Sequence, residues 1–191
     1  MDERDLGRVL LTIARSAIAA RLGLGRSGEA SDAALARPGA TFVTLKRHGE
    51  LRGCIGSLKP VRPLGVDVHE NAIAAAFRDP RFPPLAAHEL EATSVEVSLL
   101  SAGERVDAAD EAALHARLRP GVDGLILEYG LHRATFLPQV WEALADPREF
   151  VTALKRKAGL PGDFWSPQVN ISRYTVTKWE ESRFLMSETQ R

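Results

Sequence analysis

The sequence predicts an α+β protein whose sheets are mostly antiparallel or mixed and are flanked by helices. Two observations support this class. Strand-like segments occur in pairs joined by short glycine-containing turns, which is the arrangement of β-hairpins. Helical segments stand before, between and after these pairs rather than alternating with single strands, so the pattern favours α+β over a parallel α/β sheet.

Length and charge limit the class of partner. The chain has 191 residues, enough for one domain or for two small lobes that share a core. Basic and acidic residues number 25 each, and 45% of the residues are hydrophobic, so the composition of a disordered protein is absent. The chain has no excess of positive charge that would attract nucleic acid or an anionic membrane, so we expect neither as a partner.

The N-terminal segment predicts an amphipathic helix on the core, because apolar residues recur at helical spacing between residues 6 and 18. Arg8 and Arg15 interrupt this apolar stretch, so we expect neither a signal peptide nor a membrane span. The single cysteine, Cys54, can form no intrachain disulfide. Together these features predict a protein of the reducing cytoplasm.

Residues 40–90 predict a hairpin, a helix and a stiff connector. Thr, Val and Phe favour two strands over residues 40–58, and His48-Gly49 suits the tight turn between them. An alanine-rich helix is expected from about Leu64 to Arg78, because a residue that precedes proline avoids the α region. The segment "DPRFPPLAAHEL" then contains three prolines, which restrict its backbone.

Residues 92–181 predict the remaining elements in order. "ATSVEVSLLS" alternates as a strand with Val95 and Val97 on one face and Glu96 on the other. A short helix over residues 108–118 and a second hairpin over residues 123–138 follow. Residues 146–159 have a proline at the first helical position and a closing glycine, which predict a capped helix. "NISRYTVTKWEE" predicts one last strand.

The stretch "LRGCIG" contains the first candidate site. Side chains alternate along a strand, so Arg52 and Cys54 are expected on the same side, where the guanidinium would favour the thiolate form of a nucleophile. Gly53 and Gly56 would let a ligand or another backbone segment approach closely. The alternative is that Cys54 is buried as a small hydrophobic residue, and the sequence leaves both interpretations open.

Other motif templates do not match. "GCIG" has the G-x-x-G spacing of a nucleic-acid-binding KH loop, but that loop joins two helices, whereas "GCIG" lies in a strand pattern without compensating basic residues. "GCIGSLK" is too short for a phosphate-binding loop. His69-Glu70 and His88-Glu89 begin like zinc-protease helices, yet neither is followed by a second histidine at the required spacing. We therefore expect no metal site, and no pattern names a cofactor.

Several motifs in order resemble the AMMECR domain family, also called AmmeMemoRadiSam system protein A. They include "LRGCIG", "DPRFPPL" and "FLPQV", and the resemblance runs from about Phe42 to Trp179. It implies a single AMMECR domain over residues 1–191, two-lobed with a cleft between the lobes, and a smaller lobe within about residues 101–140. It also implies an association with a Memo-like protein and a radical SAM protein, but it supplies no reaction.

The family pattern assigns candidate roles residue by residue. Cys54, Arg52 and Glu96 become catalytic candidates, with Arg52 tuning the thiol and Glu96 as general acid or base. The candidate substrate contacts are Gly53, Gly56, Asn71, Asp79, Arg81, Gln139 and Lys157. Thiol, guanidinium, carboxylate and amide groups together suit a small polar or anionic substrate. The alternative is a non-catalytic binding or scaffold protein that uses the same surface.

Overall fold

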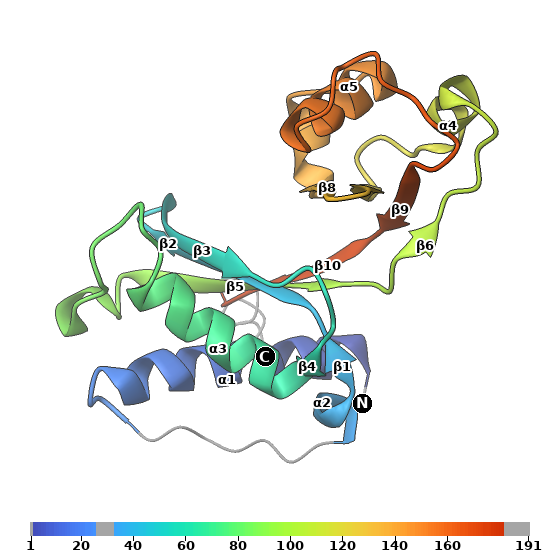
Figure 1. Cartoon of the computed structure of the whole chain (residues 1–191). Coiled ribbons are helices and arrows are strands. Elements are labelled where there is room, and N and C mark those ends of the chain that lie inside the picture. The colour runs from blue at the N-terminus through green and yellow to red at the C-terminus, as the bar shows by residue number, and fades with distance from the viewer. Residues whose placement is uncertain (1, 26–32, 182–191) are drawn as a thin grey trace. The chain divides into compact units, whose positions relative to one another are not determined.

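The computed structural model describes residues 2–25 and 33–181, which form two compact units (Figure 1). The first unit contains the chain up to Leu100 and again from Thr177, and the second comprises Ser101–Val176. The predicted α+β class is confirmed, because helices accompany sheets whose strands pair antiparallel. The cleft expected between two lobes stays a prediction.

The first unit is built on a sheet with the strand order β10-β5-β2-β3. Its strands are β2 (Thr41–Arg47), β3 (Glu50–Gly56), β5 (Thr93–Leu100) and β10 (Val176–Glu180). Helices α1 (Glu3–Arg21) and α3 (Leu64–Phe77) lie together on one face of this sheet (Figure 1). Val43, Leu45, Val95 and Val97 point into the core between sheet and helices. The other face of the sheet is the polar one, as the alternation in β5 predicts.

The ends of these elements follow from local chemistry. Asp2 caps α1 by accepting a hydrogen bond from the Asp5 amide, and α3 begins directly after Pro63. His48 and Gly49 have φ angles of 53° and 83°, the left-handed backbone that a two-residue hairpin turn needs, so the predicted β2–β3 hairpin is confirmed.

The second unit contains a sheet with the order β6-β9-β7-β8. Its strands are β6 (Glu104–Arg105), β7 (Gly124–Tyr129), β8 (His132–Phe136) and β9 (Asn170–Tyr174). Helices α4 (Glu111–Arg117) and α5 (Pro147–Lys157) and the 3-10 turn η2 (Pro138–Glu142) complete it. At its centre the rings of Trp141 and Phe150 stack with centroids 3.8 Å apart. The Asp146 side chain caps α5 as predicted, by accepting from the Arg148 amide.

The structure differs from the sequence prediction at the C-terminal strand. The single strand expected over residues 170–181 is two strands, β9 and β10, which belong to different sheets. The break falls at Thr175, whose amide donates to the Ser101 hydroxyl and whose carbonyl accepts from the Ser101 amide. The second unit continues beyond the range of about residues 101–140 proposed for a smaller lobe, because β9 pairs with β7 and α5 packs on β8.

Short elements were not expected from the sequence. They are α2 (Ala33–Ala36), β1 (Pro38–Gly39), β4 (Arg62–Pro63), η1 (Ala87–Glu89), η2 and β6. Such elements are too short for a periodic pattern to form. The small-residue sequence of residues 25–39 predicts a turn-rich connection, part of which lies outside the described residues. Across residues 2–25 and 33–181, no helix has the length and apolar character needed to cross a membrane.

Candidate functional site

Cys54 is half-buried on the polar face of the first sheet. Its neighbour Gly53 faces the helices, because a Cβ atom there would lie 2.2 Å from the Ala75 carbonyl oxygen of α3. Since side chains alternate along a strand, Cys54 points the other way. It is paired with Thr44 of β2, whose hydroxyl donates to the sulfur at 3.2 Å. The thiol therefore has a polar neighbour and is not enclosed in the aliphatic core.

The two glycines of the motif are already used by the protein itself. Gly53 lets α3 approach β3 closely. A Cβ atom at Gly56 would lie 2.3 Å from the ring of Phe42 on the paired strand. The sequence left open whether a ligand or another backbone segment approaches these positions, and for Gly53 the structure shows a backbone segment. Their role as substrate contacts stays a prediction.

Asp79 and Arg81 hold the backbone of Cys54 at the edge of the sheet. The Cys54 amide donates to the Asp79 carboxylate at 2.9 Å, and the Arg81 guanidinium donates to the Cys54 carbonyl at 3.1 Å. Arg81 also binds Asp79 directly, at 2.6 Å. The hydrogen bond from Arg81 lowers the pKa of Asp79 well below its ordinary value, with a further contribution from the Cys54 amide. This ion pair takes the place that a neighbouring strand would have.

Arg52 has a different partner from the one expected. The pairing of β2 with β3 shifts by one residue between Leu45 and Lys46, so regular alternation is interrupted at Arg52. Its guanidinium donates to both carboxylate oxygens of Glu89, at 3.1 and 2.9 Å. Hydrogen bonds from Arg52, the larger cause, and from the Ala86 amide lower the pKa of Glu89 to about 2. The structure therefore corrects the expected neighbour of Arg52: it is Glu89, not the Cys54 thiol.

Glu96 lies in line with Cys54 across the sheet, with Thr44 between them, because Thr44 is paired with both. It is 5% exposed and receives hydrogen bonds of 2.9 Å from the ammonium groups of Lys46 and Lys178. Burial alone would raise the pKa of Glu96. Its side-chain hydrogen bonds, including those donated by Lys46 and Lys178, lower this pKa below its ordinary value. A carboxylate held ionised in this way is poorly suited to act as a general acid.

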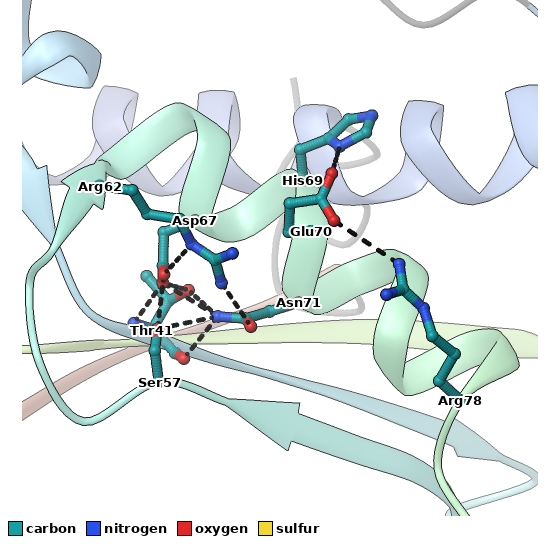
Figure 2. A network of polar contacts seen from close by, with 8 residues as sticks. All are labelled: Thr41, Ser57, Arg62, Asp67, His69, Glu70, Asn71 and Arg78. Atoms are coloured by element: carbon teal, nitrogen blue, oxygen red, sulfur yellow. Dashed lines mark hydrogen bonds and ion pairs between the residues drawn. The ribbon is translucent and has the colours of Figure 1, made fainter.

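Asn71 belongs to a separate buried cluster around Asp67, at the start of α3 (Figure 2). Asp67 has no exposed surface and accepts hydrogen bonds from both the amide and the hydroxyl of Thr41. Ser57, Arg62 and Asn71 donate to it as well. The Asn71 amide is thus occupied within the protein, and its role as a substrate contact stays a prediction.

Gln139 and Lys157 are both exposed residues of the second unit. Lys157 donates to the Thr135 carbonyl at 3.0 Å and lies 5.0 Å from the centre of the Phe136 ring. Their participation in a site with Cys54 also stays a prediction. The residues that the structure does gather around Cys54 are Thr44, Asp79, Arg81 and, across the strand, Glu96.

Sequence reasoning missed Thr44, Lys46, Glu89 and Lys178. Lys46 follows Thr44 by two residues on the same strand, so alternation alone could have placed it on the polar face. The hydrogen bond that Lys46 donates to Glu96 raises the pKa of Lys46, which keeps this ammonium group charged. Within the described ranges, no group of three or more His, Cys, Asp or Glu side chains is arranged to hold a metal ion.

Comparisons with known proteins give relatives of unassigned activity. A protein of Methanothermobacter thermautotrophicus is 42% identical over 188 residues, covering 93% of this chain and 95% of the relative. Protein MJ0810 of Methanocaldococcus jannaschii is 42% identical over 144 residues, covering 73% and 72%. The crystal structure of uncharacterized protein PH0010 from Pyrococcus horikoshii has a TM-score of 0.79 at 34% identity and covers 93% of this chain and 92% of its own.

The Methanothermobacter relative and the Pyrococcus crystal structure each match nearly the whole length of the chain, and the crystal structure shares its fold. The model of the AMMECR1 family matches residues 11–179, which include both hairpins, the proline-rich connector and the polar face around Cys54. The resemblance inferred from the sequence motifs is thereby confirmed: the chain belongs to the AMMECR1 family.

Proposed function

We propose that the polar face of the first unit binds a small polar or anionic molecule, with Cys54 as the reactive group that contacts it. The observation that supports this proposal is the row formed by Cys54, Thr44 and Glu96 across three neighbouring strands, with Lys46 and Lys178 on the carboxylate. A thiol with a hydroxyl donor and two nearby ammonium groups can orient negatively charged or hydrogen-bonding atoms.

Each residue has a role in this proposal. Cys54 contacts the bound molecule, Thr44 orients the sulfur, and Asp79 with Arg81 are positioning residues that hold the Cys54 backbone. Arg52 acts through Glu89 on the connector and not on the thiol. On the basis of the family resemblance, we extend the proposal: the protein acts in the cytoplasm, together with a Memo-like protein and a radical SAM protein.

The second candidate is a binding or scaffold protein that performs no chemistry on this face. One observation favours it: Glu96 is ionised and held by two lysines, and Arg52 is bound to Glu89, so these two groups are occupied within the protein. In that case Cys54 contributes shape and a hydrogen-bonding atom to a recognition surface.

The test is a metabolite capture experiment with the full chain. Native protein, Cys54→Ala and the exposed control variant Val61→Ala are incubated with a cytoplasmic metabolite extract, and bound small molecules are identified by mass. We expect a polar or anionic molecule that binds the native protein and Val61→Ala and is lost from Cys54→Ala. The same molecule should protect Cys54 from alkylation by iodoacetamide.

Two outcomes decide between the candidates, and a third contradicts both. Conversion of the captured molecule supports the enzyme, whereas capture and protection without conversion support the binding protein. If Cys54 reacts with iodoacetamide only in unfolded protein and no captured molecule depends on it, the thiol is a packing residue and the proposal is wrong.

A further inference from the structure

The second unit contains a pocket of about 250 Å³ that the polar face around Cys54 does not use. Its lining residues come from β6, the chain that follows β6, α4, the segment before β9 and β9 itself, all within the second unit. Val106, Leu114, Trp165 and Val169 are apolar residues of its lining, but polar atoms make up more of the accessible lining than apolar atoms do. A concave site with both kinds of surface suits a small molecule that has an apolar part and a polar part.

The walls of this pocket are tied together by buried bonds. Lys155 of α5 is 1% exposed and donates to Glu111 of α4 at 2.8 Å and to the Phe164 carbonyl at 3.1 Å. It therefore links the helix that carries Leu114 to the residue that precedes Trp165. The Val106 amide also donates to the carbonyl of Ile171 at 2.8 Å, which joins the two sides of the pocket. Such a pre-formed pocket binds without a large cost of ordering.

The charged groups at the pocket favour an anion. Arg105 and Asp107 line it and pair with each other at 3.2 Å, but their side chains are 66% and 84% exposed, so water weakens this pair. Arg105 is thus the cation among the pocket's lining residues, and it can exchange its exposed partner for a ligand carboxylate. Ser166, also in the wall, offers a hydroxyl donor.

We propose that this pocket binds a small aromatic carboxylate, whose ring lies against Trp165 and the other apolar lining residues and whose carboxylate is bound by Arg105. At ordinary packing density the volume accommodates roughly 12 non-hydrogen atoms, the size of one fused ring system with a carboxyl group. A planar guanidinium binds a carboxylate through two parallel hydrogen bonds, which gives preference over uncharged molecules of the same shape. The inference is independent of any chemistry at Cys54.

The experiment uses three probes of one shape: 2-naphthoate, uncharged 2-naphthamide and cationic 2-naphthylmethylamine. Each is titrated into the full chain labelled with ¹⁵N, and the indole N–H signals of the three tryptophans are followed. We expect 2-naphthoate to shift the Trp165 signal to saturation, with the amide binding at least fivefold more weakly. Trp141 serves as an internal reference, because its indole is buried and bound to the Asp123 carbonyl.

Variants separate the carboxylate contact from the apolar contact. Arg105→Gln should weaken 2-naphthoate about five- to tenfold and leave 2-naphthamide unchanged, while Arg133→Gln, whose arginine pairs with Glu128 on the neighbouring hairpin, should change neither. Ala108→Phe should fill the pocket and abolish both, with the dispersed spectrum showing that the chain is folded.

Three results would overturn the proposal. The first is the absence of a saturable Trp165 shift with 2-naphthoate. The second is binding of the amide or the amine as tight as that of the carboxylate. The third is equal weakening by Arg105→Gln and Arg133→Gln. Alkylation of Cys54 should be the same with and without 2-naphthoate, so failure here is distinct from failure of the proposal for the first unit.

Discussion

The two units each bury a charged side chain, but they surround it differently. Asp67 in the first unit accepts hydrogen bonds from four residues, and it ties the start of α3 to β2 and to the residue after β3 (Figure 2). Lys155 in the second unit donates to one carboxylate and one carbonyl, and so links two segments that contribute lining residues to the pocket. A buried charge with many fixed partners makes a more rigid junction than one with few partners.

The comparison extends to function. In the first unit, the charged groups near Cys54 are paired within the protein, and the thiol with its single hydroxyl donor is the lightly bonded group. In the second unit, the charged pair at the pocket is exposed to water and can exchange partners. The first unit therefore presents a reactive sulfur atom among charged groups that are already paired. The second presents a pocket with a guanidinium group whose ionic partner can be replaced by a ligand.

Removing the two buried charges should give the largest effects and is the direct test of this comparison. Asp67→Ala should lower the free energy of unfolding of the first unit by about 3–5 kcal/mol, because it leaves Arg62 and the hydroxyl and amide donors without their acceptor. Lys155→Met should lower that of the second unit by about 1–2 kcal/mol, since methionine refills the volume and water reaches Glu111, which is 26% exposed.

Urea unfolding followed by the indole signals of Trp179 in the first unit and Trp141 in the second measures both changes. Asp107→Ala, at a side chain that is 84% exposed, is the control and should change neither signal. Equal losses, or a larger loss for Lys155→Met, would show that the number of partners does not separate the two units.

The Glu89–Arg52 pair should give a pH-dependent effect of intermediate size. Because the pKa of Glu89 is about 2 in the folded chain and ordinarily 4.5, its stabilisation is present above pH 4.5 and is lost as the pH falls toward 2. At pH 7 the free energy of unfolding of the native protein should exceed that of Glu89→Gln by about 1–2 kcal/mol. This difference is small because Arg47, the second partner of Glu89, is exposed to water.

Urea unfolding of the first unit, followed by Trp179 at pH 7, 4.5 and 3, measures the difference between the two proteins. It should shrink steadily below pH 4.5. The control is Glu104→Gln in the second unit, where an exposed carboxylate pairs with Arg173 and should contribute no measurable stability. A difference that is constant between pH 7 and 3 would contradict the assigned ion pair.

Thr44→Val should give the smallest effect. Loss of the hydroxyl that donates to sulfur removes a hydrogen bond, worth about 0.5–1 kcal/mol, that stabilises the reacting charged form of the sulfur, so alkylation of Cys54 by iodoacetamide at pH 7.5 should slow about threefold. Thr135→Val in the second unit, whose hydroxyl donates to a backbone carbonyl, is the matched control. Faster alkylation in Thr44→Val would mean that the threonine shields the sulfur from solvent instead of stabilising its charge.

Local signals predicted most of the regular elements. The β2–β3 hairpin followed from His48-Gly49, and α3 followed from its alanine-rich body and the proline after it. The C-terminal strand could not be divided from the sequence, because its break depends on Ser101, more than seventy residues away along the chain. Strand periodicity carries no information about such a distant partner.

The site was predicted less well, for a physical reason. Strand alternation correctly placed Glu96 on the sheet face that does not carry Val95 and Val97. It gave the wrong neighbour for Arg52, because the register shift interrupts the alternation there. That shift is not visible in the sequence, since it depends on how two strands pair. A family pattern also groups residues without any information about their geometry. For this reason the sequence prediction assigned Asn71 to the same site as Cys54, although Asn71 lies in its own buried cluster.

The hydrogen bonds between Ser101 and Thr175 bear on how the chain folds. Strands β5 and β10 are neighbours in one sheet, yet roughly 75 residues separate them, and closing so long a loop of unfolded chain costs about 4 kcal/mol of entropy. Once the second unit has folded, its two ends are already held together at this point, and β10 can join β5 at little further cost. Folding of the second unit then brings the last strand of the first unit into place, so completion of the first unit's sheet is a late step in folding.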